Sequence, residues 1–94
     1  MILIHGQHFL TDEGRSYFPI FIKNIEIAMK EYNKGFISIR QIKKVNESDE
    51  THFLLEYESF ELLKEFSKTT AHDNIQSTLK KFQLKSPHVI KYFF

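Results

Sequence analysis

The sequence contains no cysteine. It therefore forms no disulfide, supplies no thiolate nucleophile and builds no cysteine-ligated zinc site. Only three of its 94 residues are glycine. These glycines form neither a phosphate-binding loop nor a dinucleotide-binding fingerprint. The sequence also lacks the G-x-S-x-G motif of a serine nucleophile elbow. We therefore expect no bound cofactor, whether flavin or nicotinamide.

The chain also lacks an excess of charge of either sign. Its 13 basic and 12 acidic residues are interspersed and leave a net charge of +1. Neither nucleic acid nor an anionic membrane surface is therefore an expected partner. No apolar run approaches the roughly 18 residues of a membrane span, and polar residues from His5 onward interrupt the apolar start before a signal peptide could form. We expect a cytoplasmic protein.

Aromatic residues, by contrast, are abundant. They make up 15% of the chain, and ten of them are phenylalanine. The length suits one small domain, residues 1–94, whose single core is only marginally large enough for stability. So many large apolar side chains exceed what one small core can bury, and small domains bury such a surplus by oligomerising.

Alternating and continuous apolar patterns predict four strands. They are expected over residues 2–10, 36–45, 51–57 and 88–94. The polar stretch 46–50 predicts a turn that joins the middle two strands into a hairpin. Apolar residues fall on both faces of the first and last strands, which indicates that both faces of these strands are covered.

Helical periodicity predicts a first helix over residues 11–32, in which Pro19 should kink the helix or divide it. Gly35 is expected in a left-handed conformation after the end of this helix. A second helix is predicted over residues 59–66, with Ser59 as its cap. A third is predicted to open at Thr70, and Ser86–Pro87 should end the helical region.

The predicted element order is β-α-β-β-α-β, which is the ferredoxin-like arrangement of the α+β class: an antiparallel sheet with helices on one face. Helices can cover only one face of such a sheet, yet the first and last strands are apolar on both. We therefore expect the open face to pack against a second copy of the chain, giving a homodimer.

Several polar residues are candidates for chemistry. His72 stands near the start of the third predicted helix, and an imidazole there could move a proton near neutral pH, or it could simply form a local hydrogen bond. Gln7 and His8 interrupt an apolar strand; neighbours alternate, so one of them must face the helices. His5 and His8 are three residues apart on a strand and point to opposite faces, so no metal site is expected.

Three segments together resemble a known family. They are FLLEYESFELLKEF at residues 53–66, the helix start Ala71–His72, and Gly35–Phe36 at the opening of the second strand. With them the chain resembles the antibiotic-biosynthesis monooxygenase-like family of dimeric α/β barrels. The resemblance implies ferredoxin-like subunits that dimerise through their sheets.

The resemblance also implies a function. Some members of this family are cofactor-independent monooxygenases that oxidise small aromatic quinols or anthrones with O₂. In that reading His72 is the base or orienting group, Gln7 or His8 holds a substrate oxygen, and Tyr57 and Phe66 form aromatic walls of the pocket.

A haem-degrading branch of the family is disfavoured. Gln7 and Phe66 stand where that branch has asparagine and tryptophan, and His72 follows Phe66 more closely than the axial histidine follows that tryptophan. The usual tryptophan at the end of the third strand is Tyr57 here. The remaining alternative is a non-catalytic dimeric module, which either binds a small aromatic ligand or acts as a stress or accessory protein.

Overall fold

The computed structural model describes residues 1–43 and 51–94, and within them the chain forms four strands and three helices. In order these are β1 (Ile2–Leu10), α1 (Asp12–Tyr32), β2 (Phe36–Ile42), β3 (Thr51–Tyr57), α2 (Phe60–Ser67), α3 (Thr70–Lys80) and β4 (Gln83–Phe93). The predicted extension of the second strand to residue 45 and the predicted turn at 46–50 fall outside the described residues.

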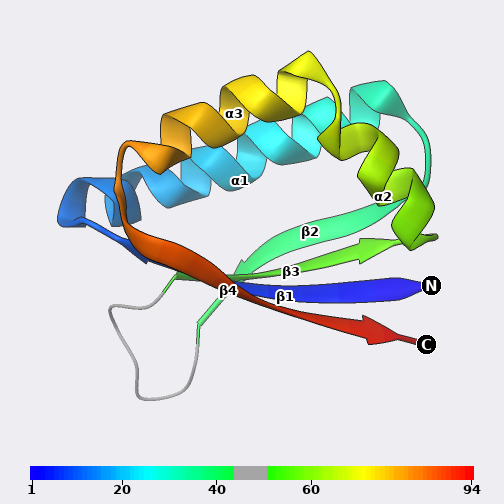
Figure 1. The fold of residues 1–94 in the computed structure, drawn as a ribbon, viewed down its shortest axis with the longest axis horizontal. Coiled ribbons are helices and arrows are strands. Elements are labelled where there is room, and N and C mark those ends of the chain that lie inside the picture. Colours follow the sequence, from blue (N-terminus) through cyan, green and yellow to red (C-terminus); the bar gives the residue numbers. More distant parts are fainter. Residues whose placement is uncertain (44–50) are drawn as a thin grey trace.

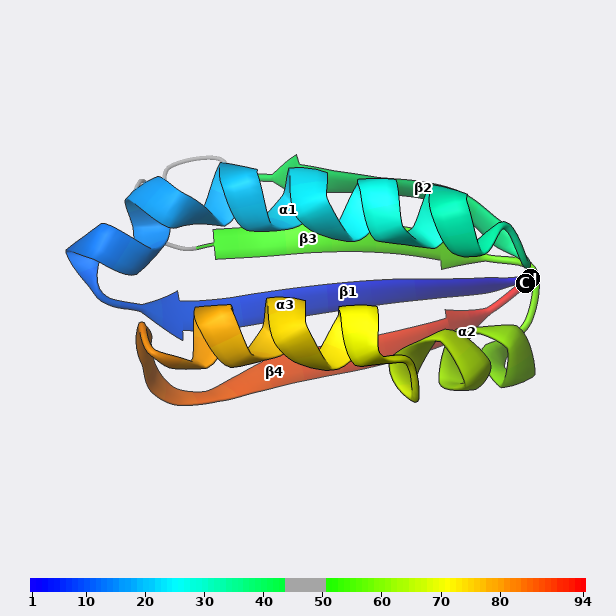
Figure 2. The ribbon, with the colours of Figure 1, turned by 90° about the horizontal axis from the view of Figure 1, so that it is seen from above.

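The strands form one antiparallel sheet in the order β2-β3-β1-β4. All three helices lie on the same face of this sheet (Figure 1). Seen from the helix side, α1 runs above β2 and β3, and α3 runs above β1 and β4 (Figure 2). The predicted ferredoxin-like α+β fold is confirmed, and so is the division of the second helical region into two helices.

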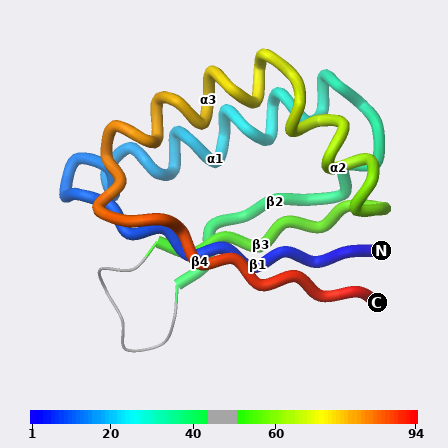
Figure 3. The backbone as a smooth tube through the Cα atoms, in the orientation of Figure 1, coloured from blue at the N-terminus to red at the C-terminus, as the bar shows by residue number. Residues whose placement is uncertain are grey.

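The two ends of the described chain lie side by side, because β4 runs along β1 and ends near the N-terminus (Figure 3). The amino group of Met1 donates to the carbonyl of Phe94 at 3.0 Å. The N–H of Phe94 in turn donates to the carbonyl of Met1 at 3.1 Å. These two hydrogen bonds join the outer ends of the first and last strands of the chain.

The core lies between the sheet and the helices. Even-numbered residues of β1 are buried under the helices, whereas odd-numbered residues are only partly buried on the open face. The register carries this alternation to β3, since Ile2 pairs with Tyr57 and Ile4 with Leu55. Helix α1 contributes the largest share of the buried side chains: Phe18, Phe21, Ile22, Ile25 and Met29.

Pro19 was expected to kink the first helix or to divide it, and the division does not occur, since α1 runs unbroken from Asp12 to Tyr32. A proline inside a helix costs about 3 kcal/mol through its missing N–H and a clash with the preceding turn. Each large apolar side chain that α1 buries contributes about 1.5–3 kcal/mol, and five of them outweigh that cost. Asn33 ends the helix in the left-handed region with φ 54°, and Gly35 follows with φ 84°, as predicted for this glycine.

The caps of the two shorter helices differ in how well the sequence predicted them. Ser59 caps α2 as expected, and its Oγ accepts from the N–H of Leu62 at 3.2 Å. The helix α3 begins at Thr70, as predicted, but Thr69 rather than Thr70 caps it, and the Oγ1 of Thr69 accepts from the N–H of His72 at 3.2 Å. Both threonines are suitable caps, and Thr69 is the one with extended backbone dihedrals.

The boundary predicted at Ser86–Pro87 is also wrong, because α3 ends at Lys80 and β4 already begins at Gln83. The strand accommodates the proline at an irregularity. Gln7 pairs with His88 and Phe9 with Lys85, so the register with β1 shifts across Ser86 and Pro87. Proline lacks an N–H and is tolerated in edge strands at such shifts.

None of the helices in the two described stretches is long and apolar enough to cross a membrane.

Candidate ligand cavity between helices and sheet

A small, partly open cavity lies between the helices and the sheet, with a volume of about 100 Å³. Its apolar walls come from α1, the sheet and α2: Phe21, Ile25, Met29, Ile39, Phe53, Leu55 and Leu63. Three polar side chains complete the lining: His8, His72 and Gln76. An apolar chamber with a few convergent polar groups is the usual form of a small-molecule site.

His8 reaches the cavity because it is one of the even-numbered residues of β1 that face the helices. Its ring is enclosed by three phenylalanine rings, with centroids 5.4 Å from Phe18, 5.9 Å from Phe21 and 5.7 Å from Phe53. The hydroxyl of Thr51 donates to its backbone carbonyl at 2.6 Å. Backbone and ring of His8 are therefore both held in place.

Burial in this aromatic surrounding lowers the pKa of His8 from 6.5 to about 4, because desolvation disfavours the charged imidazolium. His8 is therefore neutral at physiological pH. Its Nδ1 is buried and has no hydrogen-bond partner among the residues that the structure describes. An unpaired buried polar atom costs about 1–3 kcal/mol, a cost that a bound ligand could remove.

His72 enters the cavity from the first turn of α3, where the Thr69 cap fixes the start of the helix. Its ring packs edge-on against Phe66, with centroids 5.7 Å apart. Its Nδ1 is buried and, within the described part of the chain, without a hydrogen-bond partner. The nearest carboxylate oxygen, from Asp73, lies 3.6 Å away, beyond hydrogen-bond distance. Two imidazoles with unpaired nitrogens thus line one apolar chamber.

Gln76 is a cavity residue that the sequence analysis missed. It lies one turn after His72 on α3, and residues four apart share a helix face. That spacing could have identified it once His72 had been singled out. Its side-chain amide adds both a donor and an acceptor to the lining.

Three other predicted site residues lie elsewhere. Gln7 is on the open face of the sheet, opposite the cavity, where it pairs with His52 and His88. Tyr57 and Phe66 are fully buried in the core and do not line the cavity. Phe66 still touches the site, because His72 packs on its ring. Burial and the nearby Tyr32 raise the pKa of the Tyr57 hydroxyl, which is buried without a described partner.

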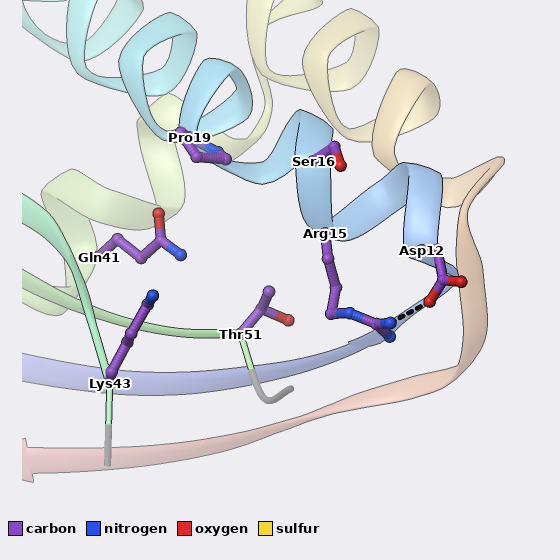
Figure 4. A pocket seen from close by; sticks show the side chains of 7 residues that line it. All are labelled: Asp12, Arg15, Ser16, Pro19, Gln41, Lys43 and Thr51. Carbon is purple, nitrogen blue, oxygen red and sulfur yellow. Dashed lines mark hydrogen bonds and ion pairs between the residues drawn. The ribbon is translucent and has the colours of Figure 1, made fainter. Parts of the chain in front are cut away.

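A larger hollow of about 700 Å³ lies between the first turns of α1 and the ends of β2 and β3 (Figure 4). Its lining is mainly polar: Asp12, Arg15, Ser16, Pro19, Gln41, Lys43 and Thr51. Arg15 is paired with Asp12 and also donates to the carbonyl of Leu10 at 3.1 Å. The arginine of this hollow is already paired, and the walls of the hollow reach the edge of the described chain, so the smaller cavity lined by His8 and His72 is the better candidate site.

The histidines do not gather around a metal position. His5 lies on the open face, where its Nε2 is 2.9 Å from Nδ1 of His52, and His8 lies on the helix face, as their spacing predicted. No group of three or more metal-ligating side chains occurs in the two described stretches.

Comparisons with known proteins support the fold. No family model matches the sequence, and no curated protein matches it either. Solved structures do match. One comes from Nitrosomonas europaea and is provisionally named an antibiotic biosynthesis monooxygenase. It superposes with a TM-score of 0.81 at 10% sequence identity, and the alignment covers 100% of this chain and 98% of that protein's chain. A second structure with the same provisional name comes from Caulobacter crescentus CB15. Its TM-score is 0.83 at 13% sequence identity, and the alignment covers 97% of this chain and 86% of that protein's chain.

A third structure carries a stated activity. SnoaB, described as a cofactor-independent oxygenase from Streptomyces nogalater, superposes with a TM-score of 0.79 over 99% of this chain and 91% of its own, at 4% identity. The chain therefore has the ferredoxin-like fold of structures named as antibiotic biosynthesis monooxygenases. At 4–13% identity this likeness establishes the fold and no more.

Proposed function

We propose that the chain is a cofactor-independent monooxygenase that oxidises a small aromatic substrate, quinol-like or anthrone-like, with O₂. The observation that carries the proposal is the apolar cavity lined by His8 and His72, each of which has a buried Nδ1 without a hydrogen-bond partner among the described residues. The shared fold with SnoaB, described as a cofactor-independent oxygenase, adds support.

Such a reaction needs little from the protein beyond binding, desolvation and proton transfer. The His72 imidazole takes a proton from a substrate hydroxyl, and the electron-rich anion supplies electrons to O₂. A carbon–oxygen bond then forms, the O–O bond breaks, and the second oxygen atom leaves as water. For a quinol the balance is hydroquinone plus O₂ giving hydroxybenzoquinone plus water, so no external reductant is consumed.

Oxygen uptake by the purified protein tests this proposal. With reduced quinones and anthrones as substrates, we expect O₂ consumption with release of the oxygenated product, and we expect His72→Ala to lower the rate at least tenfold because the proton acceptor is lost. Asn74→Ala, which truncates an exposed side chain on the same helix as His72, is the matched control and should retain the wild-type rate.

Failure of uptake across the whole panel would reject the monooxygenase. If a ligand then raised the melting temperature without turnover, a non-catalytic module that binds a small aromatic ligand would be the correct reading.

We further propose that the chain works as a homodimer, with its open sheet face against a second copy. Two large apolar side chains of β4 are exposed on the open face, Ile90 and Tyr92, which pair with His5 and Leu3. β4 is also an edge strand with unpaired backbone groups. A second copy would cover both the apolar residues and the edge.

Sedimentation analysis tests the dimer. We expect the wild-type protein to sediment at twice its chain mass of 11.3 kDa. Ile90→Glu should shift it to the monomer, because Ile90 pairs with His5 on the open face and a buried charge there would be unpaired. Ile27→Glu, on the exposed side of α1, should leave the mass unchanged. A wild-type monomer at micromolar concentration would contradict the proposal.

A further inference from the structure

The size of the cavity limits what it can hold. Its volume is about 100 Å³, whereas an apolar protein cavity of about 150 Å³ takes up benzene. One six-membered ring can enter if a flexible wall residue moves slightly, and Met29 is the most adaptable of these residues. Three fused rings are much larger than this volume and could not be held inside it.

One wall of the cavity is fixed by the backbone opposite it. Phe53 pairs with Gly6 across the sheet, and a Cβ on that glycine would lie 2.2 Å from the Phe53 ring. The ring therefore occupies the space that the missing side chain leaves. Since Phe53 also contacts the ring of His8, it cannot retreat in that direction either, and the chamber cannot widen on this side.

The polar groups of the lining define the chemistry of the ligand. A neutral imidazole offers one acceptor and one donor nitrogen. His8 and His72 each present a buried Nδ1 for which the described residues supply no partner. Hydroxyl groups can donate to an imidazole or accept from it. A ligand that satisfies both histidines carries two hydroxyls on one small apolar body.

From these observations we infer that the cavity binds a single-ring dihydroxybenzene, with one hydroxyl hydrogen-bonded to His8 and the other to His72. This inference rests on the proposed function and narrows its substrate class to one ring. It assigns His8 the role of a binding residue that selects for the second hydroxyl, while His72 accepts the proton. Gln76, on the same face of α3 as His72, is the remaining polar contact.

The test measures binding in the absence of O₂, so that it is independent of turnover. Titrations followed by NMR would use hydroquinone, catechol and anthrone as probes. We expect the two dihydroxybenzenes to bind and shift the signals of residues around the cavity, and anthrone not to bind. His8→Phe should weaken hydroquinone binding about tenfold, the loss of one hydrogen bond, and the exposed control Asn74→Ala should leave the affinity unchanged.

A second variant covers the case in which His8→Phe does not fold. Leu63→Ala shortens a wall residue that is only partly buried, and it should allow a two-ring diol such as 1,4-dihydroxynaphthalene to bind at least tenfold more tightly than to the wild type. Equal affinity of wild type and Leu63→Ala for the two-ring diol would overturn the size limit.

The remaining outcomes separate this inference from the proposed function. Dihydroxybenzene binding without oxygen uptake would reject the monooxygenase and leave the inference standing. Oxygen uptake with anthrone, in a protein that does not bind hydroquinone, would overturn the inference and leave the monooxygenase standing. Unchanged hydroquinone affinity in a folded His8→Phe would also overturn the role of His8.

Discussion

Replacing Phe18 with alanine is expected to lower the free energy of unfolding by about 3–5 kcal/mol. Phe18 is fully buried. Its ring stacks on that of Phe21 with centroids 5.5 Å apart and lies 5.4 Å from the ring of His8. Truncation would remove apolar contacts on both sides and leave a void. Small domains have a total stability of only about 5–15 kcal/mol, so the variant should lose a large part of it.

Urea unfolding followed by circular dichroism at pH 7.5 measures this loss. Ile20→Ala is the matched control, because Ile20 belongs to the same helix and is 55% exposed. Its unfolding free energy should change by no more than about 0.5 kcal/mol. A loss below about 1 kcal/mol in Phe18→Ala would show that the aromatic cluster around His8 is not part of the stabilising core.

Acidification is expected to destabilise the protein through His8. Its pKa is about 4 in the folded state and 6.5 in the unfolded chain. Between these values the unfolded chain binds more protons, so the free energy of unfolding falls as the pH drops. The stability is fully present above about pH 6.5 and is lost progressively down to about pH 4. Between pH 7.5 and 4.5 the His8 contribution to this loss should be about 2 kcal/mol.

Other groups also titrate in this range, so the comparison is between two proteins. His8→Phe keeps an aromatic ring in the site but cannot be protonated. Urea unfolding at both pH values should show a loss about 2 kcal/mol larger in the wild type than in this variant. Equal losses in the two proteins would mean that His8 is hydrated or paired, and would remove the argument for a neutral imidazole in the cavity.

Much of the fold could be predicted because its strands and helices follow simple periodicities. The apolar patterns of β1 and β3 predicted their boundaries, and the apolar face of α1 predicted its extent. The errors lie where two residues of similar propensity compete. Thr69 and Thr70 are the same residue type and so have the same propensity to cap a helix. The tertiary position of α3 decides between them. Pro87 indicated a boundary, but an edge strand with a shifted register tolerates it.

The site was predictable only in part. The alternation of side chains along a strand showed that either Gln7 or His8 faces the helices. Which one does so depends on which side of β1 packs against α1, and the structure shows that this side carries His8. Tyr57 and Phe66 were expected as pocket walls and instead fill the core. Whether a buried aromatic residue borders a cavity depends on how neighbouring side chains fill space, and a linear pattern does not contain that information.

The strand order determines when the chain can fold during synthesis. β1 is made first, but its neighbours in the sheet are β3 and β4, which begin at Thr51 and Gln83. β2 pairs with β3 and not with β1. A ribosome that has released residues 1–43 has therefore released two strands that have no native pairing with each other. The sheet cannot begin to form until β3 has been made, and it is completed only when β4 has been made. The apolar faces of β1 and α1 therefore stay uncovered for most of translation. Chaperone binding or rapid completion of the chain is then needed to avoid aggregation.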